Sequence, residues 1–492
     1  MTQGISRRRI VAGLGTCGAS VLARSVFAEQ SVPPGPATLP LAERLAAYAF
    51  KLSYADLSAE TIEAVKAHLI DTIGCGIAAF EERPVQICRD VVLAASGGVS
   101  TVIGTKRNAP TDLAAFANGA AFRYYDMNDA YVGHVAGHPS DHIAPCLAVA
   151  EAERSSAEEL ITSIVIAYEI NCRLIDAFDI STRGWDPPVF SPPAIALAVG
   201  KLMKLDLEKL TQAVNLAIND HIPMGQTRVQ TISDWKGLAD AEAGRNAIFA
   251  AQLARAGLTG PAPIFEGRSG FLRLITGPGE IDVDAFGQRG LPFKISDCGM
   301  KAYPAQVHTQ TAIVAAIALA KEISDLTRVT AIDIATTHRG FQVDASEPEK
   351  WAPTTKETAD HSLPYITARA MFEGDINNDS YTSEKLRDPR ILAFMQKIKV
   401  TEDPTFATPA GNAPSNRIVA TLDDGRRIVR QVDNMPGFPG QPMSRADVER
   451  KFRSNIGKRW SQEQTDAVLR AMWDLDHTHD ISDLLGKLSL RA

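Results

Sequence analysis

The sequence predicts a mainly α-helical discontinuous domain combined with a smaller α+β lid domain. Apolar residues recur at helical spacing over most of residues 41–296. After Phe293 the pattern changes to β-branched segments and a hairpin signal, which predict the α+β lid domain over 297–433. Helical spacing returns over 434–492, so both ends of the chain are expected to build the helical domain. A length of 492 residues exceeds what one hydrophobic core usually supports, which agrees with two domains.

Residues 1–28 are predicted to be an export signal and not part of either domain. Three arginines at 7–9 precede a weakly hydrophobic stretch over 11–23, and small residues over 26–28 stand where a signal peptidase cleaves. This order is typical of a twin-arginine signal peptide and predicts a periplasmic protein. No other apolar run reaches the ~18 residues of a membrane span, so no membrane segment is expected after signal removal.

Local signals mark individual helices within the first helical segment. Ser156 and Glu159 form a capping box that opens a long helix, whose apolar positions recur at helical spacing from Leu160 onward. An alanine-rich segment over 239–256 predicts a second long helix. These signals place two long helices after the polar segment over 124–141.

Strand and helix signals alternate within the predicted lid. Residues 416–422 and 426–432 are strand-like segments that flank an Asp-Asp-Gly turn, which is a strong hairpin signal. Ser444 starts the closing helical stretch. The other expected elements of the lid are strands over 329–337 and 397–400 and helices over 309–322 and 363–372.

Composition restricts the class of partner. The chain is 45% hydrophobic and 22% charged, as in ordinary soluble globular proteins, and its formal net charge is -7. A negative chain argues against a nucleic-acid partner, although it does not exclude a local basic pocket.

One short segment concentrates groups that exchange protons near neutral pH. Asp126, Asp129, His134 and His138 fall within thirteen residues, between segments with the pattern of apolar helices. Because the two aspartates are three apart, they are expected to share one face of a helix or of its last turn. His134, His138 and His142 are spaced by four, but a proline interrupts the spacing and no metal-protease motif occurs, so no metal site is predicted.

Four residues elsewhere add to this segment. Lys236 precedes the helix over 239–256, and Lys301 stands close to His308; either lysine could hold a carboxylate or simply lie at the surface. Tyr365 lies in an otherwise apolar helix, where most tyrosines are packed with the hydroxyl satisfied. Lysines, histidines and a tyrosine without a phosphate loop suit a small anionic carboxylate substrate.

Taken together, these segments resemble the MmgE/PrpD family, which includes 2-methylcitrate dehydratases and cis-aconitate decarboxylases. The resemblance covers roughly residues 41–490. It is carried by Asp126-Met127-Asn128-Asp129, His138-Pro139-Ser140, Arg183-Gly184-Trp185-Asp186, Lys236-Gly237, Lys301-Ala302-Tyr303-Pro304 and Thr358-Ala359-Asp360-His361-Ser362-Leu363-Pro364-Tyr365. The last block is specific, whereas His-Pro or Lys-x-Tyr-Pro alone would not be.

The resemblance implies a large helical domain built from both ends of the chain, a lid between them, a homodimer, and no metal or organic cofactor. It implies substrate binding by Lys236 and Lys301. By position it places the catalytic residues at Asp126, His138, Lys301 and Tyr365, with His134 and His308 as nearby candidates. Two positions depart from the family pattern: Asp186 follows Trp185 where relatives often carry a histidine, and Ala130 stands where some carry a hydroxyl.

The expected function is that of a lyase, a hydratase or dehydratase acting on a small di- or tricarboxylate related to 2-methylcitrate. Lys236 and Lys301 would hold substrate carboxylates, and His138 or Asp126 would remove the proton next to a carboxylate. Tyr365 or a second histidine would protonate the leaving hydroxyl. The alternatives are a decarboxylase or isomerase on the same scaffold, or a non-catalytic periplasmic binder of organic acids.

Overall fold

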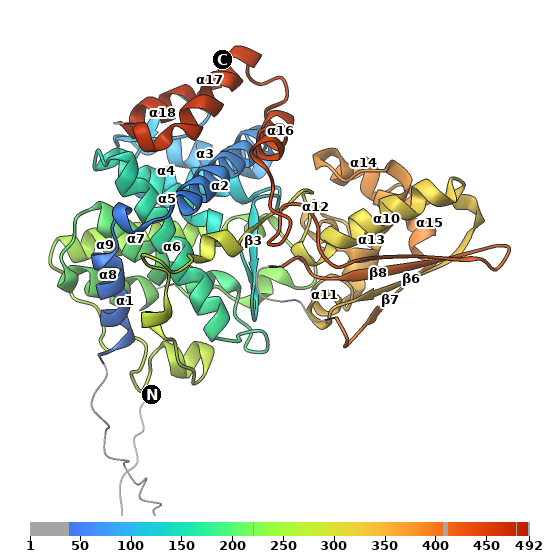
Figure 1. Ribbon diagram of the computed structural model, residues 1–492, viewed down its shortest axis with the longest axis horizontal. Coiled ribbons are helices and arrows are strands. Elements are labelled where there is room, and N and C mark those ends of the chain that lie inside the picture. The colour runs from blue at the N-terminus through green and yellow to red at the C-terminus, as the bar shows by residue number, and fades with distance from the viewer. Residues whose placement is uncertain (1–38, 220, 407–411, 479, 491–492) are drawn as a thin grey trace, which may run out of the picture. The chain divides into compact units, whose positions relative to one another are not determined.

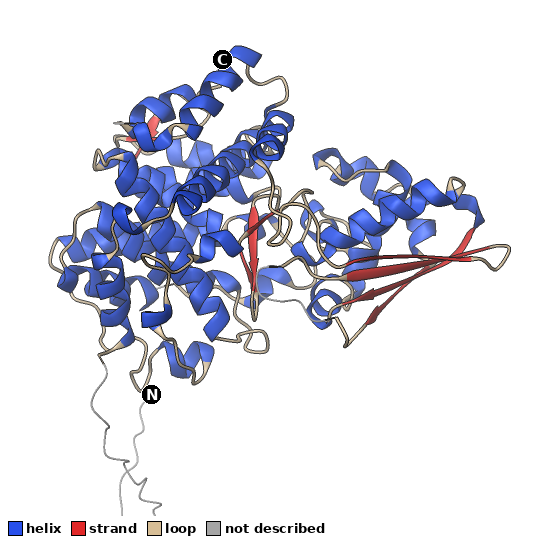
Figure 2. Cartoon of the chain, in the orientation of Figure 1, coloured by secondary structure: helices blue, strands red, loops and turns tan. Residues whose placement is uncertain are grey.

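The computed structural model describes residues 39–219, 221–406, 412–478 and 480–490. The chain from Pro40 onward forms one compact unit. Most of it is helical, and the longer strands gather in one sheet (Figure 2). The predicted export signal lies outside the described residues. Within the described ranges, the helices are too short or too polar to cross a bilayer.

The helical part has one hydrophobic core to which both ends of the chain contribute. In Figure 1 the last helices lie beside the first ones, with α16 and α17 against α2 and α18 against α5. A side chain at Gly74 of α2 would come within 2.9 Å of the Phe452 ring of α16, so this close packing requires glycine. The helices of this part are α1 (Leu41–Lys51), α2 (Ala59–Ala78), α3 (Arg83–Leu93), α4 (Thr111–Arg123), α5 (Ile143–Ala152), α6 (Ala157–Ala177), α7 (Ser191–Leu202), α8 (Leu207–Asn219), α9 (Ala239–Arg255), α16 (Arg445–Ile456), α17 (Gln462–Trp473) and α18 (Ile481–Lys487).

Two of these helices begin at capping boxes that are visible in the sequence. The Ser156 hydroxyl accepts from the N–H of Glu159, whose carboxylate accepts from the N–H of Ser156 at 2.9 Å. Ser444 and Asp447 make the same reciprocal pair at the start of α16. Each box pairs backbone donors that the first turn of a helix leaves free, which fixes where the helix starts.

The α+β part has its own hydrophobic core beneath a four-stranded sheet of order β7-β6-β8-β9. Strands β6 and β7 are parallel, and the other pairs are antiparallel. The predicted Asp-Asp-Gly hairpin joins β8 to β9, and the buried residues Ile418, Ala420 and Leu422 alternate along β8 and face the core. Helix α10 packs against β8 and β9, and α13 packs against α10 (Figure 1). The elements are β6 (Val329–Thr336), β7 (Ile398–Glu402), β8 (Asn416–Leu422), β9 (Arg427–Val432), α10 (Gln310–Ile323), α11 (His338–Asp344), α12 (Lys356–Ala359), α13 (Leu363–Glu373), α14 (Ser383–Leu386) and α15 (Pro389–Met395).

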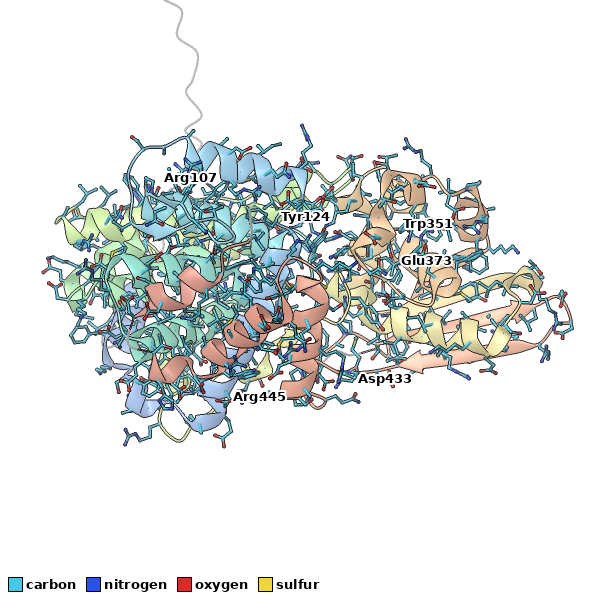
Figure 3. The ribbon with its side chains drawn as sticks, turned by 90° about the horizontal axis from the view of Figure 1, so that it is seen from above. Arg107, Tyr124, Trp351, Glu373, Asp433 and Arg445 are labelled. Atoms are coloured by element: carbon cyan, nitrogen blue, oxygen red, sulfur yellow. The ribbon has the colours of Figure 1, made fainter. Side chains whose placement is uncertain are left out.

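The mainly helical fold with a smaller α+β part is therefore confirmed. In Figure 3, Arg445 lies among the helices of the first core, whereas Trp351 and Glu373 lie among the elements of the second. The division at 296/297 and 433/434 stays a prediction, because the chain from Pro40 onward is a single compact unit.

Short strands outside the four-stranded sheet form a β1-β2 pair and a β4-β3-β5 sheet. They are β1 (Ser100–Thr101), β2 (Asn108–Ala109), β3 (Asp129–Val132), β4 (Ala136–Gly137) and β5 (Gly299–Met300). Strand β3 pairs with β4 and β5, and Asp129 lies opposite Met300. One expectation is wrong here: Asp126 and Asp129 do not share a helix face, because α4 ends at Arg123 and Asp129 begins a strand.

Candidate active site

Asp126 occupies the centre of a buried charged cluster. Its N–H donates to the Arg123 carbonyl at 3.0 Å, which closes a turn directly after α4. Its φ of 53° lies in the left-handed region that aspartate tolerates better than most residues. The turn directs the carboxylate back toward Arg123, whose guanidinium donates to Oδ1 at 2.5 Å.

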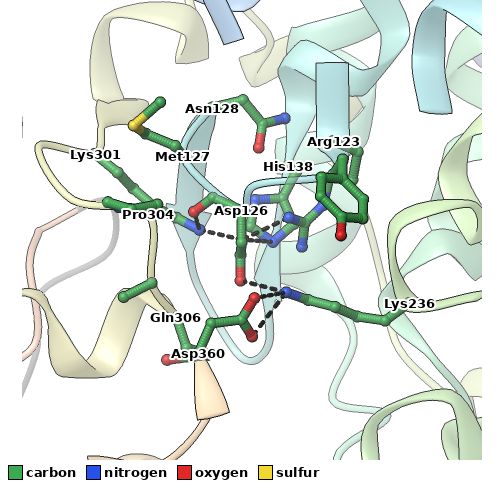
Figure 4. Close-up of polar contacts among 12 residues, drawn as sticks. Arg123, Asp126, Met127, Asn128, His138, Lys236, Lys301, Pro304, Gln306 and Asp360 are labelled. Atoms are coloured by element: carbon green, nitrogen blue, oxygen red, sulfur yellow. Dashed lines mark hydrogen bonds and ion pairs between the residues drawn. The ribbon is translucent and has the colours of Figure 1, made fainter. Parts of the chain in front are cut away.

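Two lysines from distant segments complete the shell around this carboxylate. Lys301, one residue beyond β5, donates to Asp126 Oδ1 and to the Asp126 carbonyl, the latter at 2.9 Å. Lys236, in the 3-10 helix η5 (Asp234–Gly237), lies 3.1 Å from Oδ2. Figure 4 shows the two ammonium groups on opposite sides of Asp126. Each of the four residues of this cluster is at most 1% exposed: Arg123, Asp126, Lys236 and Lys301.

A second carboxylate, Asp360, extends the cluster. Lys236 donates to both of its oxygens at 3.0 Å, and Lys356 donates to Oδ2 at 2.8 Å. His361 Nδ1 lies 2.6 Å from Oδ1. Four cationic side chains face Asp126 and Asp360 in these contacts, and Arg123 also lies 3.4 Å from Asp141 Oδ2, so the cations outnumber the carboxylates that they contact.

This arrangement shifts the pKa values of its members. Burial raises the pKa of Asp126, but Arg123, Lys236 and Lys301 outweigh it and hold that pKa well below its usual range. Burial lowers the pKa of Lys301 to about 8, against the opposing effect of Asp126. Asp126 is thus a fixed anion, and Lys301 is the cation of the cluster that titrates nearest to neutral pH.

Two histidines each offer an unprotonated Nε2 to this cluster. His138 Nδ1 donates to the Asp129 carbonyl at 2.7 Å, and His361 Nδ1 donates to the Asp360 carboxylate. Because both partners only accept, the proton stays on Nδ1, and each Nε2 lies 3.9 Å from an Asp126 oxygen. Burial, with help from the nearby cations, lowers the pKa of His138 well below its usual value and that of His361 to about 3.

The strand that carries the His138 partner is itself anchored. Asp129 Oδ2 lies 3.0 Å from His68 Nδ1, and Asp129 Oδ1 accepts from the N–H of Ser140 at 3.0 Å. Asn128 donates to the Ser140 hydroxyl at 2.9 Å and to Asp141 at 2.7 Å. These bonds tie β3 to the 3-10 helix η2 (Pro139–His142), so the His138 imidazole is held at a fixed position.

A cavity of about 610 Å³ opens beside the cluster. Arg123, Asp126, His138 and His361 line it from the cluster side. This volume is in the range of small-molecule sites. The remaining polar residues of the lining are Asn171, Ser181, Asp186, Ser191, Gln226, Arg228, Asp240, Gln306, His308, Arg339, Gln342 and Glu347.

The structure brings only part of the sequence-predicted set to this cavity. Asp126, His138 and His308 line it, and no hydrogen-bond partner of His308 Nδ1 occurs among the described residues. Lys236 and Lys301 are fully buried behind the lining, with their ammonium groups on carboxylates. The two lysines therefore contact Asp126 and do not line the cavity.

Two predicted residues lie apart from the cluster. His134 is exposed between β3 and β4 and does not line the cavity. The Tyr365 hydroxyl donates to the Ser380 carbonyl at 2.7 Å and accepts from Arg369. Tyr365 is a packed core residue of the α+β part with a satisfied hydroxyl.

Sequence reasoning missed four residues of the site: Arg123, Arg339, Asp360 and His361. The last two stand in the specific block that ends at Tyr365, so the signal was present but was assigned to the tyrosine. Arg123 lies three residues before Asp126, a spacing that could have suggested an ion pair. Arg339 on α11 gave no local signal.

Asp126, Asp360 and His361 place possible metal ligands within 4.8 Å of one another. The carboxylate oxygens of this group are already held by Arg123, Lys236 and other cations, which would repel a metal ion. The residues present therefore fit ion pairing better than metal binding.

Neutral imidazoles and a positively charged cluster beside a small cavity define an enzyme-type site for an anionic substrate. The chain belongs to the MmgE/PrpD family. It matches the MmgE/PrpD N-terminal domain over residues 43–284 and the MmgE/PrpD C-terminal domain over residues 303–475.

Relatives of known activity cover most of the chain. Cis-aconitate decarboxylase of Homo sapiens is 24% identical over 445 residues, which span 88% of this chain and 91% of that protein. The 2-methylcitrate dehydratases of Cupriavidus necator and Escherichia coli (strain K12) are 26% identical over 449 and 451 residues, which span 82% of this chain and 88% of each relative. The family and these relatives support a lyase-type enzyme.

Proposed function

We propose that the protein is a lyase that adds water to, or removes water from, a small di- or tricarboxylate related to 2-methylcitrate. The observation that carries this proposal is the state of His138. Its Nδ1 proton is committed to the Asp129 carbonyl, so a neutral Nε2 with a free lone pair lies at the cavity. This nitrogen is unprotonated at neutral pH, so it can accept a proton from a substrate carbon.

In this proposal, arginine side chains bind the substrate carboxylates. Arg339 lines the cavity, and none of the ion pairs among the described residues involves it. Its guanidinium can bind a carboxylate through two parallel hydrogen bonds. Arg123 also lines the cavity, although one nitrogen of its guanidinium already donates to Asp126. Lys236 and Lys301 act through Asp126 in this proposal and supply positive potential behind it.

The proposed reaction begins when His138 Nε2 removes the proton next to a substrate carboxylate. Negative charge then develops on that carboxylate, and the excess positive charge of the cluster stabilises it. The neighbouring hydroxyl then receives the proton that His138 Nε2 removed and departs as water, which returns His138 to its neutral state and leaves a carbon–carbon double bond. His361 is a second imidazole at the same cavity that can exchange a proton with substrate or water.

Decarboxylation is the second candidate, because the human relative that matches 88% of this chain is a decarboxylase. It requires the same binding of substrate carboxylates, but the bond that breaks is a carbon–carbon bond to a carboxylate and not a carbon–oxygen bond. Proton NMR of the purified protein with a panel of small polycarboxylates in D2O separates the two. We expect double-bond formation or hydration with deuterium incorporation. Loss of a carboxylate would establish the decarboxylase, and thermal stabilisation without turnover would establish a binding protein.

Lys301 is expected to set the alkaline limit of activity. Its pKa of about 8 means that it is charged below that pH and loses its charge as pH rises through it. We therefore expect kcat/KM to fall above pH 8 and Lys301→Arg to move this fall beyond pH ~10, since a guanidinium stays protonated there. The acid limit should lie well below pH 6.5, because the pKa values of His138 and His361 are lowered.

Lys356→Arg is the matched control, since Lys356 contacts Asp360 in the same cluster and its pKa is raised. It should leave the fall near pH 8 in place. A pH profile that is flat to pH 10 in the wild type, or unchanged in a folded Lys301→Arg variant, would contradict the assignment.

Export by the twin-arginine signal over 1–28, a periplasmic location and a homodimer remain proposals that rest on the sequence and on the family resemblance. They are independent of the site chemistry.

A further inference from the structure

One wall of the cavity contains carboxyl groups that the proposed reaction does not use. Asp186 and Asp240 both line it, together with the hydroxyl of Ser191. Asp186 is 0% exposed and Asp240 is 5% exposed. Buried carboxyls normally have partners for both oxygens, so their bonding shows what the wall is built to receive.

Asp186 is fixed on all sides but one. Its N–H donates to the Pro223 carbonyl at 3.0 Å, and the neighbouring Trp185 pairs with Met224 in a strand-like bridge. Its Oδ1 accepts from Arg228 Nε at 2.9 Å. Its Oδ2 is buried and has no hydrogen-bond partner among the described residues. The backbone therefore positions an acceptor that is left without a donor.

Arg228 bonds to two protein groups in this region. While its Nε is bonded to Asp186, its other end donates to the Lys236 carbonyl at 3.0 Å. It therefore fixes Asp186 and the lysine segment relative to each other. These two bonds hold the guanidinium against Asp186 Oδ1, and Asp186 Oδ2 stays without a donor.

The second carboxyl of the wall reinforces this character. Asp240, in the first turn of α9, accepts from the Ser191 hydroxyl at 2.8 Å. Burial raises the pKa of Asp186, and Asp240 raises it further against the effect of Arg228. A substrate carboxylate placed here would meet two carboxyls, whereas a hydroxyl would supply the missing donor.

We propose that Asp186 Oδ2 accepts a hydrogen bond from a hydroxyl of the substrate and thereby selects a hydroxy-carboxylate. The carboxylates of that substrate lie away from this wall, toward the arginines and the Asp126 cluster. This inference rests on the proposed function, which supplies the small carboxylate, and adds the substrate group that this position recognises. Asp186 is a specificity-determining residue in this scheme.

The test is the affinity of matched ligand pairs by titration calorimetry. Malate is compared with succinate, and citrate with tricarballylate, because each pair differs only by a hydroxyl. Wild-type protein is expected to bind the hydroxy member of at least one pair tenfold or more tightly, since a site built for a hydroxyl rejects the analogue without it. Asp186→Val removes both carboxyl oxygens and offers no group that can bond to a substrate hydroxyl. It should reduce the preference to within about twofold, through weaker binding of the hydroxy member.

Glu347→Gln is the matched control, because it also removes one carboxylate from the cavity lining, but from a residue that accepts from the N–H of Gln230 at 2.8 Å. It should keep the hydroxyl preference. Equal binding of both members of each pair by wild type, or an undiminished preference in Asp186→Val, would overturn the inference. Hydroxyl selection without turnover would support the inference and overturn the proposed function, and failure of all four ligands to bind would overturn both.

Discussion

Replacing His138 with glutamine is expected to lower kcat by about 10²–10⁴-fold while leaving the protein folded. The glutamine amide can donate to the Asp129 carbonyl that now accepts from Nδ1, so the loop after β4 keeps its anchor. The amide has no titratable nitrogen to replace Nε2, so the proton-removal step loses its base. Initial rates at saturating substrate measure kcat, and circular dichroism checks the fold.

His308→Gln is the matched control for this prediction. His308 lines the same cavity and is buried and neutral, with its pKa lowered to about 3, but its side chain is not in contact with Asp126 or Asp129. A much smaller loss of kcat is expected from it. If His138→Gln turned over at a near-normal rate, His138 would not be the base, and His361 would be the next candidate.

Much of the fold could be predicted because its signals are local. The Ser156 capping box, the helix start at Ser444 and the Asp-Asp-Gly hairpin are determined by residues within a few positions of one another, and all three occur as predicted. The sharing of one core by both chain ends was suggested by the return of helical spacing, and the packing of α16 on α2 confirms it.

The failures concern geometry that depends on distant segments. Helical spacing made a common face for Asp126 and Asp129 plausible, but the chain leaves the helix after Arg123 and reverses at Asp126. Pairing of β3 with β5 then brings Lys301 onto a carboxylate that is 175 residues away in sequence. No local sequence pattern predicts how β3 and β5 are paired.

The site residues that could be predicted are those that lie close together in the sequence. Asp126 and His138 were noticed because acids and histidines are crowded in one segment. Tyr365 illustrates the opposite case. A tyrosine in an apolar helix suits either a packed or an active-site role. The role of Tyr365 follows from the bond of its hydroxyl to the Ser380 carbonyl, fifteen residues onward, which its local sequence does not reveal. Arg339 needs the α11 fold to reach the cavity at all.

Removal of the central carboxylate is expected to have the largest effect on stability. Asp126→Ala leaves Arg123, Lys236 and Lys301 buried without their shared counter-ion. Breaking a buried ion pair in this way typically destabilises a protein by about 3–5 kcal/mol. Alanine at a φ of 53° adds backbone strain to that loss. The free energy of unfolding, measured by urea denaturation with a fluorescence readout, should fall accordingly.

The double variant Asp126→Ala/Lys301→Met separates charge from backbone strain. It keeps alanine at the strained position but removes Lys301, the cation of the three whose carboxylate contacts among the described residues are with Asp126 alone, so it should regain part of the lost stability relative to Asp126→Ala. Asp90→Ala, at an exposed position of α3, is the surface control and should change the free energy of unfolding by less than about 0.5 kcal/mol. If Asp126→Ala were as stable as this control, the cations would not depend on Asp126, and the cluster would have to be held together by Asp360 alone.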